Sequence, residues 1–184
     1  MNKVVKTSRF FKKVFMLIFC GWPIVLALIW FLPQQDWLAA GIGLSISNFI
    51  PAGLFDHILT PLSGETKAWG FLISFIPMAI GMMTSWLFIR LFQAYEHNEI
   101  FSLDSIRILK KIALVMIIGV LLDPVYQALI SFVMTAHNPA GWRIINIAIG
   151  TGDIRALITA GLIYLITYIM QEGAILREEQ ALTV

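Results

Sequence analysis

The stretch YEHNEIFSLDSIRILKK, residues 95–111, is the long polar interruption in an otherwise apolar sequence. It carries acids and bases together, and it separates one pair of hydrophobic segments from a second pair. Ser102 has the form of a helix N-cap, because its hydroxyl can accept a hydrogen bond from a first-turn N–H. Asp104 adds negative charge where the helix dipole favours it. The sequence therefore predicts a helix that starts at about Leu103, within a solvated hinge that covers residues 93–111.

The composition indicates a membrane protein. Apolar residues make up 59% of the 184 residues and charged residues 13%, whereas soluble domains are about half apolar and a quarter charged. A net charge of +2 is too small to indicate binding to nucleic acid, so we expect no direct contact with DNA or RNA. Cys20 is the single cysteine, which excludes an intramolecular disulfide and a thiolate metal cluster.

Four apolar segments are long enough to cross a bilayer, and a fully helical chain satisfies its own backbone there. We therefore expect an all-α integral membrane protein with one four-helix domain over residues 1–184. Within the second segment, Gly81-x-x-x-Ser85 is a spacing that favours close helix packing. Glycines and prolines interrupt residues 33–67, which predicts a structured outer loop. The expected spans are residues 14–32, 69–92, 112–134 and 154–171, followed by a tail over residues 172–184.

The distribution of basic residues predicts the orientation. Ten lie on the side of the termini and the hinge: Lys3, Lys6, Arg9, Lys12, Lys13, Arg90, Arg107, Lys110, Lys111 and Arg177. Three lie on the opposite side: Lys67, Arg143 and Arg155. Because basic residues are enriched in cytoplasmic segments, both termini and the hinge are expected in the cytoplasm.

Asp123 falls at the middle of the third expected span. An ionisable side chain at mid-bilayer costs about a few kcal/mol and is by default a functional candidate. Asp123-Pro124 also has the form of an N-cap followed by the first helical residue. Two interpretations stay open, a cap on the second half of a broken helix and a group that carries protons or cations. The capping pair predicts a kink or interruption at this point. We also expect Asp123 to be directed into the bundle and satisfied by hydrogen bonds rather than paired with a charge.

The connection between the third and fourth spans is expected to hold a short helix from Pro139 to Ile149. Asn138 would cap it, and proline is favoured at the first helical position. Trp142, Ile145 and Ile149 would then share one face at the membrane interface.

Two motifs resemble a known family. They are Glu99-Ile100-Phe101-Ser102 in the hinge and Leu176-Arg177-Glu178-Glu179 to Leu182-Thr183-Val184 at the end. Both are similar to motifs of the domain-of-unknown-function 2975 family of small bacterial membrane proteins. Asn98 stands where that family often has glycine, and Leu109-Lys110-Lys111 replaces an arginine-rich step. The resemblance implies four spans in the bacterial inner membrane and no established activity. Members are often encoded beside a small Cro-like helix-turn-helix regulator, which implies a regulatory partnership by association.

These features predict a non-enzymatic membrane regulator that binds a cytosolic protein, such as a small helix-turn-helix transcription factor, through the hinge and tail. The alternative is a transport or permeation protein for ions or small solutes that uses Asp123, and such a four-span unit would need to form a homo-oligomer. The tail could instead dock on its own hinge. No HExxH, GxSxG or phosphate-binding motif occurs, so we expect no enzyme, catalytic residue, metal or cofactor. The expected partner-binding residues are Glu99, Ile100, Phe101, Ser102, Arg107, Arg177, Glu178, Glu179, Leu182, Thr183 and Val184.

Overall fold

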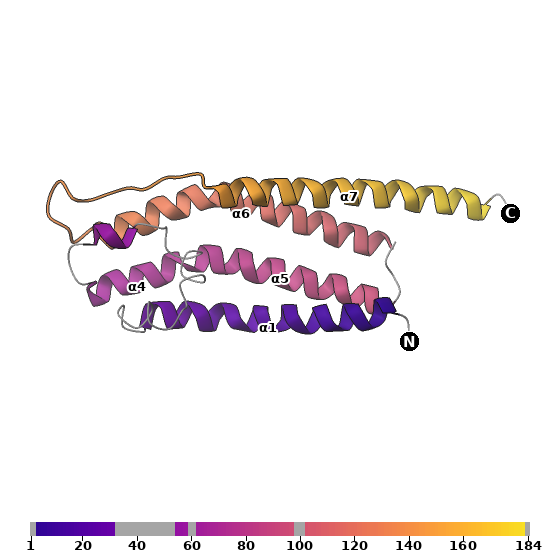
Figure 1. The fold of residues 1–184 in the computed structure, drawn as a ribbon, viewed down its shortest axis with the longest axis horizontal. Coiled ribbons are helices and arrows are strands. Elements are labelled where there is room, and N and C mark those ends of the chain that lie inside the picture. The colour runs from indigo at the N-terminus through magenta and orange to yellow at the C-terminus, as the bar shows by residue number, and fades with distance from the viewer. Residues whose placement is uncertain (1–2, 32–53, 59–61, 98–101, 183–184) are drawn as a thin grey trace. The chain divides into compact units, whose positions relative to one another are not determined.

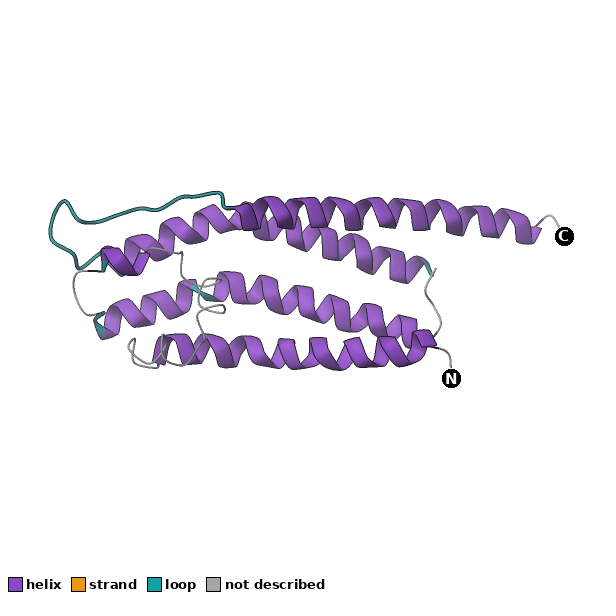
Figure 2. Cartoon of the chain, in the orientation of Figure 1, coloured by secondary structure: helices purple, strands orange, loops and turns teal. Residues whose placement is uncertain are grey.

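The computed structural model describes the backbone of residues 3–31, 54–58, 62–97 and 102–182, and the side chains of that set through Ile175 apart from Phe55 and Asp56. The regular elements in these ranges are all helical, and none is a strand (Figure 2). The expected all-α class is therefore confirmed. The elements are α1 (Lys3–Phe31), the short 3-10 helix η1 (Leu54–His57), α4 (Gly64–Ile73), α5 (Phe75–Glu96), α6 (Leu103–Thr135) and α7 (Thr151–Leu182) (Figure 1).

Four helical stretches of the described chain are long and apolar enough to cross a membrane. α4 and α5 together form one of these stretches, and the fourth covers α7 only as far as Ile175. Only 11% to 22% of each apolar window is buried, as expected for helices whose apolar surface faces lipid. The stretches are Lys3–Phe31, Gly64–Glu96, Leu103–Thr135 and Thr151–Ile175.

Internal contacts divide the chain into two compact units. Unit 1 consists of Met1–Phe19, Met82–Val120 and Thr151–Val184. Unit 2 consists of Cys20–Gly81 and Leu121–Gly150. α1, α5 and α6 each contribute one part to each unit, so the same helices are packed by two different sets of neighbours.

Serine side chains set two of the helix starts. The Ser102 hydroxyl accepts a hydrogen bond of 3.1 Å from the backbone N–H of Ser105, and α6 starts at Leu103. The predicted cap and helix start are therefore confirmed. Ser63 caps α4 in the same way through the N–H of Thr66, at 3.2 Å. The second hydrophobic stretch consequently becomes helical at Gly64, before the expected span.

α6 continues without interruption through Asp123-Pro124. The predicted interruption is therefore wrong, and Asp123 is not an N-cap, whereas a kink within the continuous helix stays a prediction. Proline removes one backbone donor from a helix, whereas a break would leave several backbone groups without partners at membrane depth. Continuing the helix costs fewer hydrogen bonds than ending it.

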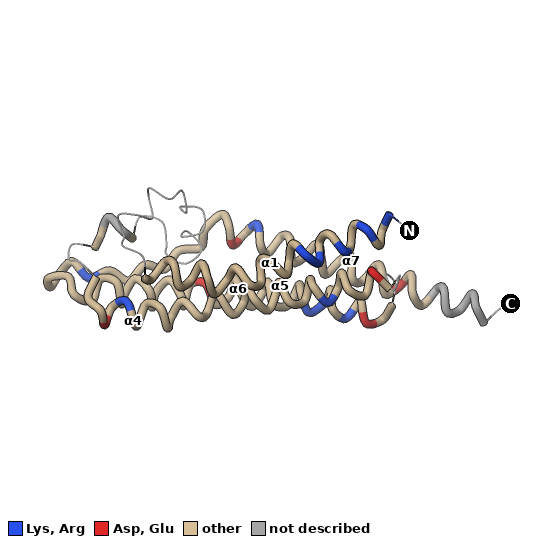
Figure 3. Tube along the Cα trace, turned by 90° about the horizontal axis from the view of Figure 1, so that it is seen from below, with Lys and Arg blue, Asp and Glu red and all other residues tan. Residues whose placement is uncertain are grey.

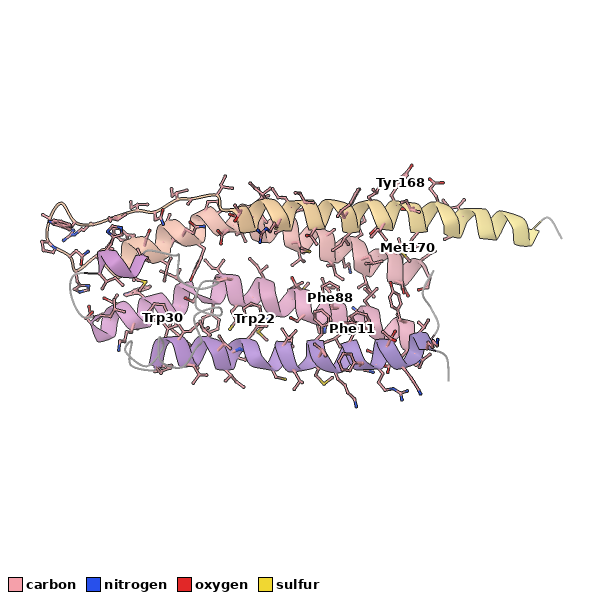
Figure 4. The ribbon with its side chains drawn as sticks, in the orientation of Figure 1. Phe11, Trp22, Trp30, Phe88, Tyr168 and Met170 are labelled. Atoms are coloured by element: carbon pink, nitrogen blue, oxygen red, sulfur yellow. The ribbon has the colours of Figure 1, made fainter. Side chains whose placement is uncertain are left out.

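Aromatic rings pack α1 against α5 in unit 1. The ring centroids of Phe15 and Phe88 lie 4.5 Å apart, and those of Phe11 and Phe92 lie 5.4 Å apart, both in stacked geometry. Figure 4 shows Phe11 and Phe88 in the seam between these two helices. Leu87 of α5 joins a buried aliphatic cluster with residues of α6, so α5 is the central helix of this packing.

Two indole rings of α1 pack on glycines in unit 2. Trp30 is buried and lies against Gly70 of α4, so closely that a Cβ at this position would overlap with the ring. Trp22 lies against Gly81 of α5 in the same manner. Both indoles point from α1 toward α4 and α5 (Figure 4). Glycine is required at both positions because only its lack of a side chain admits the ring.

Candidate functional site

A ladder of three α6 side chains holds the connection to α7. Thr135 Oγ1 accepts a hydrogen bond from the N–H of Ile144 at 3.1 Å. Ser131 Oγ accepts one from the N–H of Asn146 at 2.8 Å, and Gln127 Oε1 accepts one from the N–H of Ala148 at 3.1 Å. We call residues 144–149 the strap and the side chains of Gln127, Ser131 and Thr135 the ladder. Figure 2 shows the long loop between α6 and α7 that contains the strap.

The ladder has a regular register. Its side chains are four residues apart on α6, which is about 6 Å along a helix axis. The bonded amides are two residues apart in the strap, which is about 6.6 Å in an extended chain. These two repeat lengths nearly match, so every second amide of the strap meets the next side chain of the ladder. The alternate side chains of the strap then point away from α6, and Ile145, Ile147 and Ile149 are 63%, 63% and 73% exposed.

The expected helix from Pro139 to Ile149 is therefore wrong. A turn follows α6, with the N–H of Trp142 bonded to Pro139 O at 3.0 Å, and Gly141 adopts φ +93°, which glycine favours. Asn138 does not cap a helix. Its buried amide donates to Trp142 O at 3.0 Å and to His57 O at 2.7 Å, which fixes the turn and η1.

Asp123 stands one helical turn from the ladder. Its carboxylate accepts a hydrogen bond from Gln127 Nε2, which leaves Gln127 Oε1 directed at the strap. The expectation that Asp123 is satisfied by hydrogen bonding is thus supported by this contact. Gln127 and Ser131 each donate within α6 and accept an amide of the strap, whereas the Thr135 hydroxyl lies within donor distance of both Ser131 O and Ile144 O.

A buried serine joins three parts of unit 2. Ser74 separates α4 from α5, and its hydroxyl donates to Gly70 O at 2.8 Å. The same oxygen accepts hydrogen bonds from Trp30 Nε1 at 3.2 Å and from the Tyr126 hydroxyl at 3.3 Å. All three side chains are buried, so the Ser74 oxygen serves as an acceptor for two buried donors.

Unit 1 contains an ionic cluster at the start of the hinge. Glu96, the last residue of α5, forms ion pairs with Arg9 and Lys12 of α1, and the Arg9 Nε to Glu96 Oε1 distance is 3.1 Å. The Glu96 side chain is only 12% exposed. Figure 3 shows that lysines and arginines gather along the first part of α1. The cluster fixes where the chain leaves α5 and enters the hinge.

The structure places two of the predicted partner-binding residues together. Ser102 caps α6, and Arg107 lies one turn later on an exposed face. Arg107 Nη1 forms an ion pair with Asp104 Oδ1 at 3.3 Å, with both side chains more than 70% exposed. Leu103, beside them, is 58% exposed. The start of α6 therefore presents a mixed charged and apolar surface.

The remaining predicted partner-binding residues are less fully described. Glu99, Ile100, Phe101, Thr183 and Val184 lie outside the described residues. Arg177, Glu178, Glu179 and Leu182 belong to α7, and only their backbone is described. The proposed approach of the tail to the hinge remains a prediction.

The described side chains contain no group of three or more His, Cys, Asp or Glu residues that could hold a metal ion. What the arrangement offers is hydrogen bonding and ion pairing. Sequence reasoning missed the ladder and the Ser74 contacts, although the four-residue spacing of Gln127, Ser131 and Thr135 was a visible signal of a polar stripe on one helix face.

The all-helical architecture with four potential spans defines a multi-pass membrane protein. The chain belongs to the family described as protein of unknown function DUF2975, whose model matches residues 54–184. The resemblance found in the hinge and terminal motifs is therefore confirmed. No curated protein and no solved structure matches the chain. Family membership brings no activity with it, so the function is argued from the residues.

Proposed function

We propose that the protein is a non-enzymatic regulator of the bacterial inner membrane that binds a cytosolic protein through its hinge and tail. Both termini face the cytoplasm in this proposal, on the side with ten of the thirteen basic residues. The observation that carries it is the fixed start of α6. Ser102 caps the helix, and Leu103 and Arg107 are exposed beside the cap.

The Glu96 cluster supports this proposal. Within the hinge, ion pairs from Glu96 to Arg9 and Lys12 hold the end of α5, and the Ser102 cap holds the start of α6. A surface that is anchored at both ends loses less conformational entropy when it binds a partner. Exposed Arg107, Lys110 and Lys111 would favour a partner with an acidic face.

Site-specific photo-crosslinking tests the proposal. A photoreactive residue at Leu103 should crosslink to a small Cro-like helix-turn-helix protein when the two are co-expressed. The same residue at Trp69, which is 61% exposed on α4, is a matched control that should give no such product. Equal crosslinking from both positions, or none from Leu103, would contradict the proposal.

Transport through Asp123 is the second candidate, because Asp123 and the ladder form a polar stripe within an apolar helix. The ladder also holds the strap, so a pathway along this stripe would require the strap to leave. Asp123→Asn distinguishes the two roles. If Asp123 only orients Gln127, an amide oxygen can still accept the hydrogen bond and function should persist. Loss of function in a correctly inserted variant would favour transport.

A further inference from the structure

The strap presents one face to α6 and another away from it. The amides of Ile144, Asn146 and Ala148 are bonded to the ladder, whereas Ile145, Ile147 and Ile149 are exposed. Three branched apolar side chains on consecutive outward positions would be unfavourable in water. The outward face therefore needs an apolar partner.

The position of the ladder limits what this partner can be. Thr135 is the last residue of α6, and Gln127 lies eight residues earlier, which is about 12 Å along the helix axis. The apolar part of the α6 sequence continues to Met134. The strap thus runs back beside the segment of α6 that is apolar enough to lie in a membrane, and lipid surrounds such a segment.

The exposed apolar surface of α6 itself extends along the same segment. Val125, Leu129 and Phe132 are 53%, 42% and 52% exposed. Lipid must cover these side chains if α6 spans the bilayer, so the strap runs beside a segment of α6 that meets lipid on another face.

The backbone of the strap fits this environment. Extended chain in a bilayer needs hydrogen-bond partners, because lipid supplies none. The ladder supplies an acceptor to every second amide, and the remaining polar groups can reach water or headgroups only near the interface. This favours the boundary between headgroups and acyl chains over the bilayer centre.

We propose that the strap is a lipid-binding element of the membrane interface, in which Ile145, Ile147 and Ile149 enter the acyl chains while the ladder of α6 holds the backbone. It is separate from the hinge and does not depend on the proposed partner. In a helix, apolar residues three and four apart would face the lipid, whereas in the strap every second residue faces the lipid.

Spin-label accessibility of the full chain in phosphatidylethanolamine–phosphatidylglycerol vesicles tests this proposal. Single cysteines at residues 144–147 and 149, in a Cys20→Ser background, would carry a nitroxide. Labels at 145, 147 and 149 should collide readily with oxygen, which concentrates in lipid, and rarely with a water-soluble nickel chelate. Labels at 144 and 146 should be shielded from both. Leu129 and Glu65 provide the lipid-exposed and water-exposed controls.

Two outcomes would overturn the proposal. Frequent nickel collisions at 145, 147 and 149 would place the strap in water, and low collision rates with both reagents would mean that a second copy or another protein covers it. Thr135→Val, introduced into each of the labelled backgrounds, should abolish the period-two alternation. Thr159→Val removes a similar hydroxyl that donates only within α7 and should preserve it, so an identical response would also overturn the proposal.

Discussion

Unit 1 and unit 2 share three helices but are stabilised by different chemistry. In unit 1, α1 meets α5 through stacked phenylalanines and through the ion pairs of Glu96. In unit 2, α1 meets α4 and α5 through indole rings on glycines and through the hydrogen bond of Trp30 to Ser74, and Ser74 also bonds Tyr126 of α6. The difference teaches that one helix can use bulky and charged residues along one part and small and hydroxyl residues along another.

The strongest test of the comparison concerns Gly70 in unit 2. A Cβ there would overlap with the buried Trp30 ring, so Gly70→Ala should lower the free energy of unfolding by about 3 kcal/mol. Gly161→Ala on α7 is the matched control, because no heavy atom lies within 4 Å of its Cβ position. The free energy of unfolding of both variants would be measured in mixed micelles. Equal effects would show that close packing does not distinguish unit 2.

Removal of the Ser74 hydroxyl should have the next largest effect. Ser74→Ala leaves the Trp30 and Tyr126 donors buried without this acceptor, and we expect a loss of about 2 kcal/mol. The same unfolding measurement checks it. Tyr126→Phe removes one of the two donors and should weaken the penalty of Ser74→Ala in the double variant. Strict additivity of the two changes would argue against a shared hydrogen-bond network.

Glu96 gives a smaller and salt-dependent effect in unit 1. Glu96→Gln removes the charge that pairs with Arg9 and Lys12, so it should lower the thermal midpoint by less than Ser74→Ala. Added salt screens ion pairs, so the difference between wild type and variant should shrink as salt rises. Glu172→Gln, at an exposed position of α7, provides the control. A salt-independent difference would mean that the charges do not stabilise unit 1.

The smallest expected effect on stability belongs to Arg107. Its ion pair with Asp104 is more than 70% exposed on both sides, so Arg107→Ala should change the free energy of unfolding by less than about 0.5 kcal/mol. The same change should weaken crosslinking from Leu103 to the partner. A large loss of stability would identify Arg107 as a structural residue of unit 1 rather than a binding residue.

Local features of the sequence were sufficient to predict the helical architecture and the first residue of one helix. Apolar segments long enough to span a bilayer predicted the helical architecture, and Ser102 correctly predicted where α6 begins. Both depend on residues close together in the chain, where length, hydropathy and capping chemistry decide the outcome.

Features that depend on distant residues could not be predicted in this way. The sequence around Asp123-Pro124 favoured a helix break, but the cost of unsatisfied backbone in a membrane outweighs the local capping signal. The strap was expected to be helical. The hydrogen bonds that hold it extended could not be predicted from neighbouring residues, because they join it to Ser131 and Gln127, 15 and 21 positions away. The alternation of isoleucines over residues 145–149 was the available signal for an extended chain.

Residue-resolved amide exchange provides the most direct test of the central claim that hydrogen bonds from the ladder hold the strap in unit 2, whereas stacked rings and ion pairs join α1 to α5 in unit 1. NMR would follow the amides of Asn146 in unit 2 and His97 in unit 1, in wild type and in Ser131→Ala. Loss of one hydrogen bond of about 1 kcal/mol should accelerate Asn146 exchange about fivefold and leave His97 unchanged. An unchanged Asn146 rate, or equal acceleration at both residues, would contradict the account.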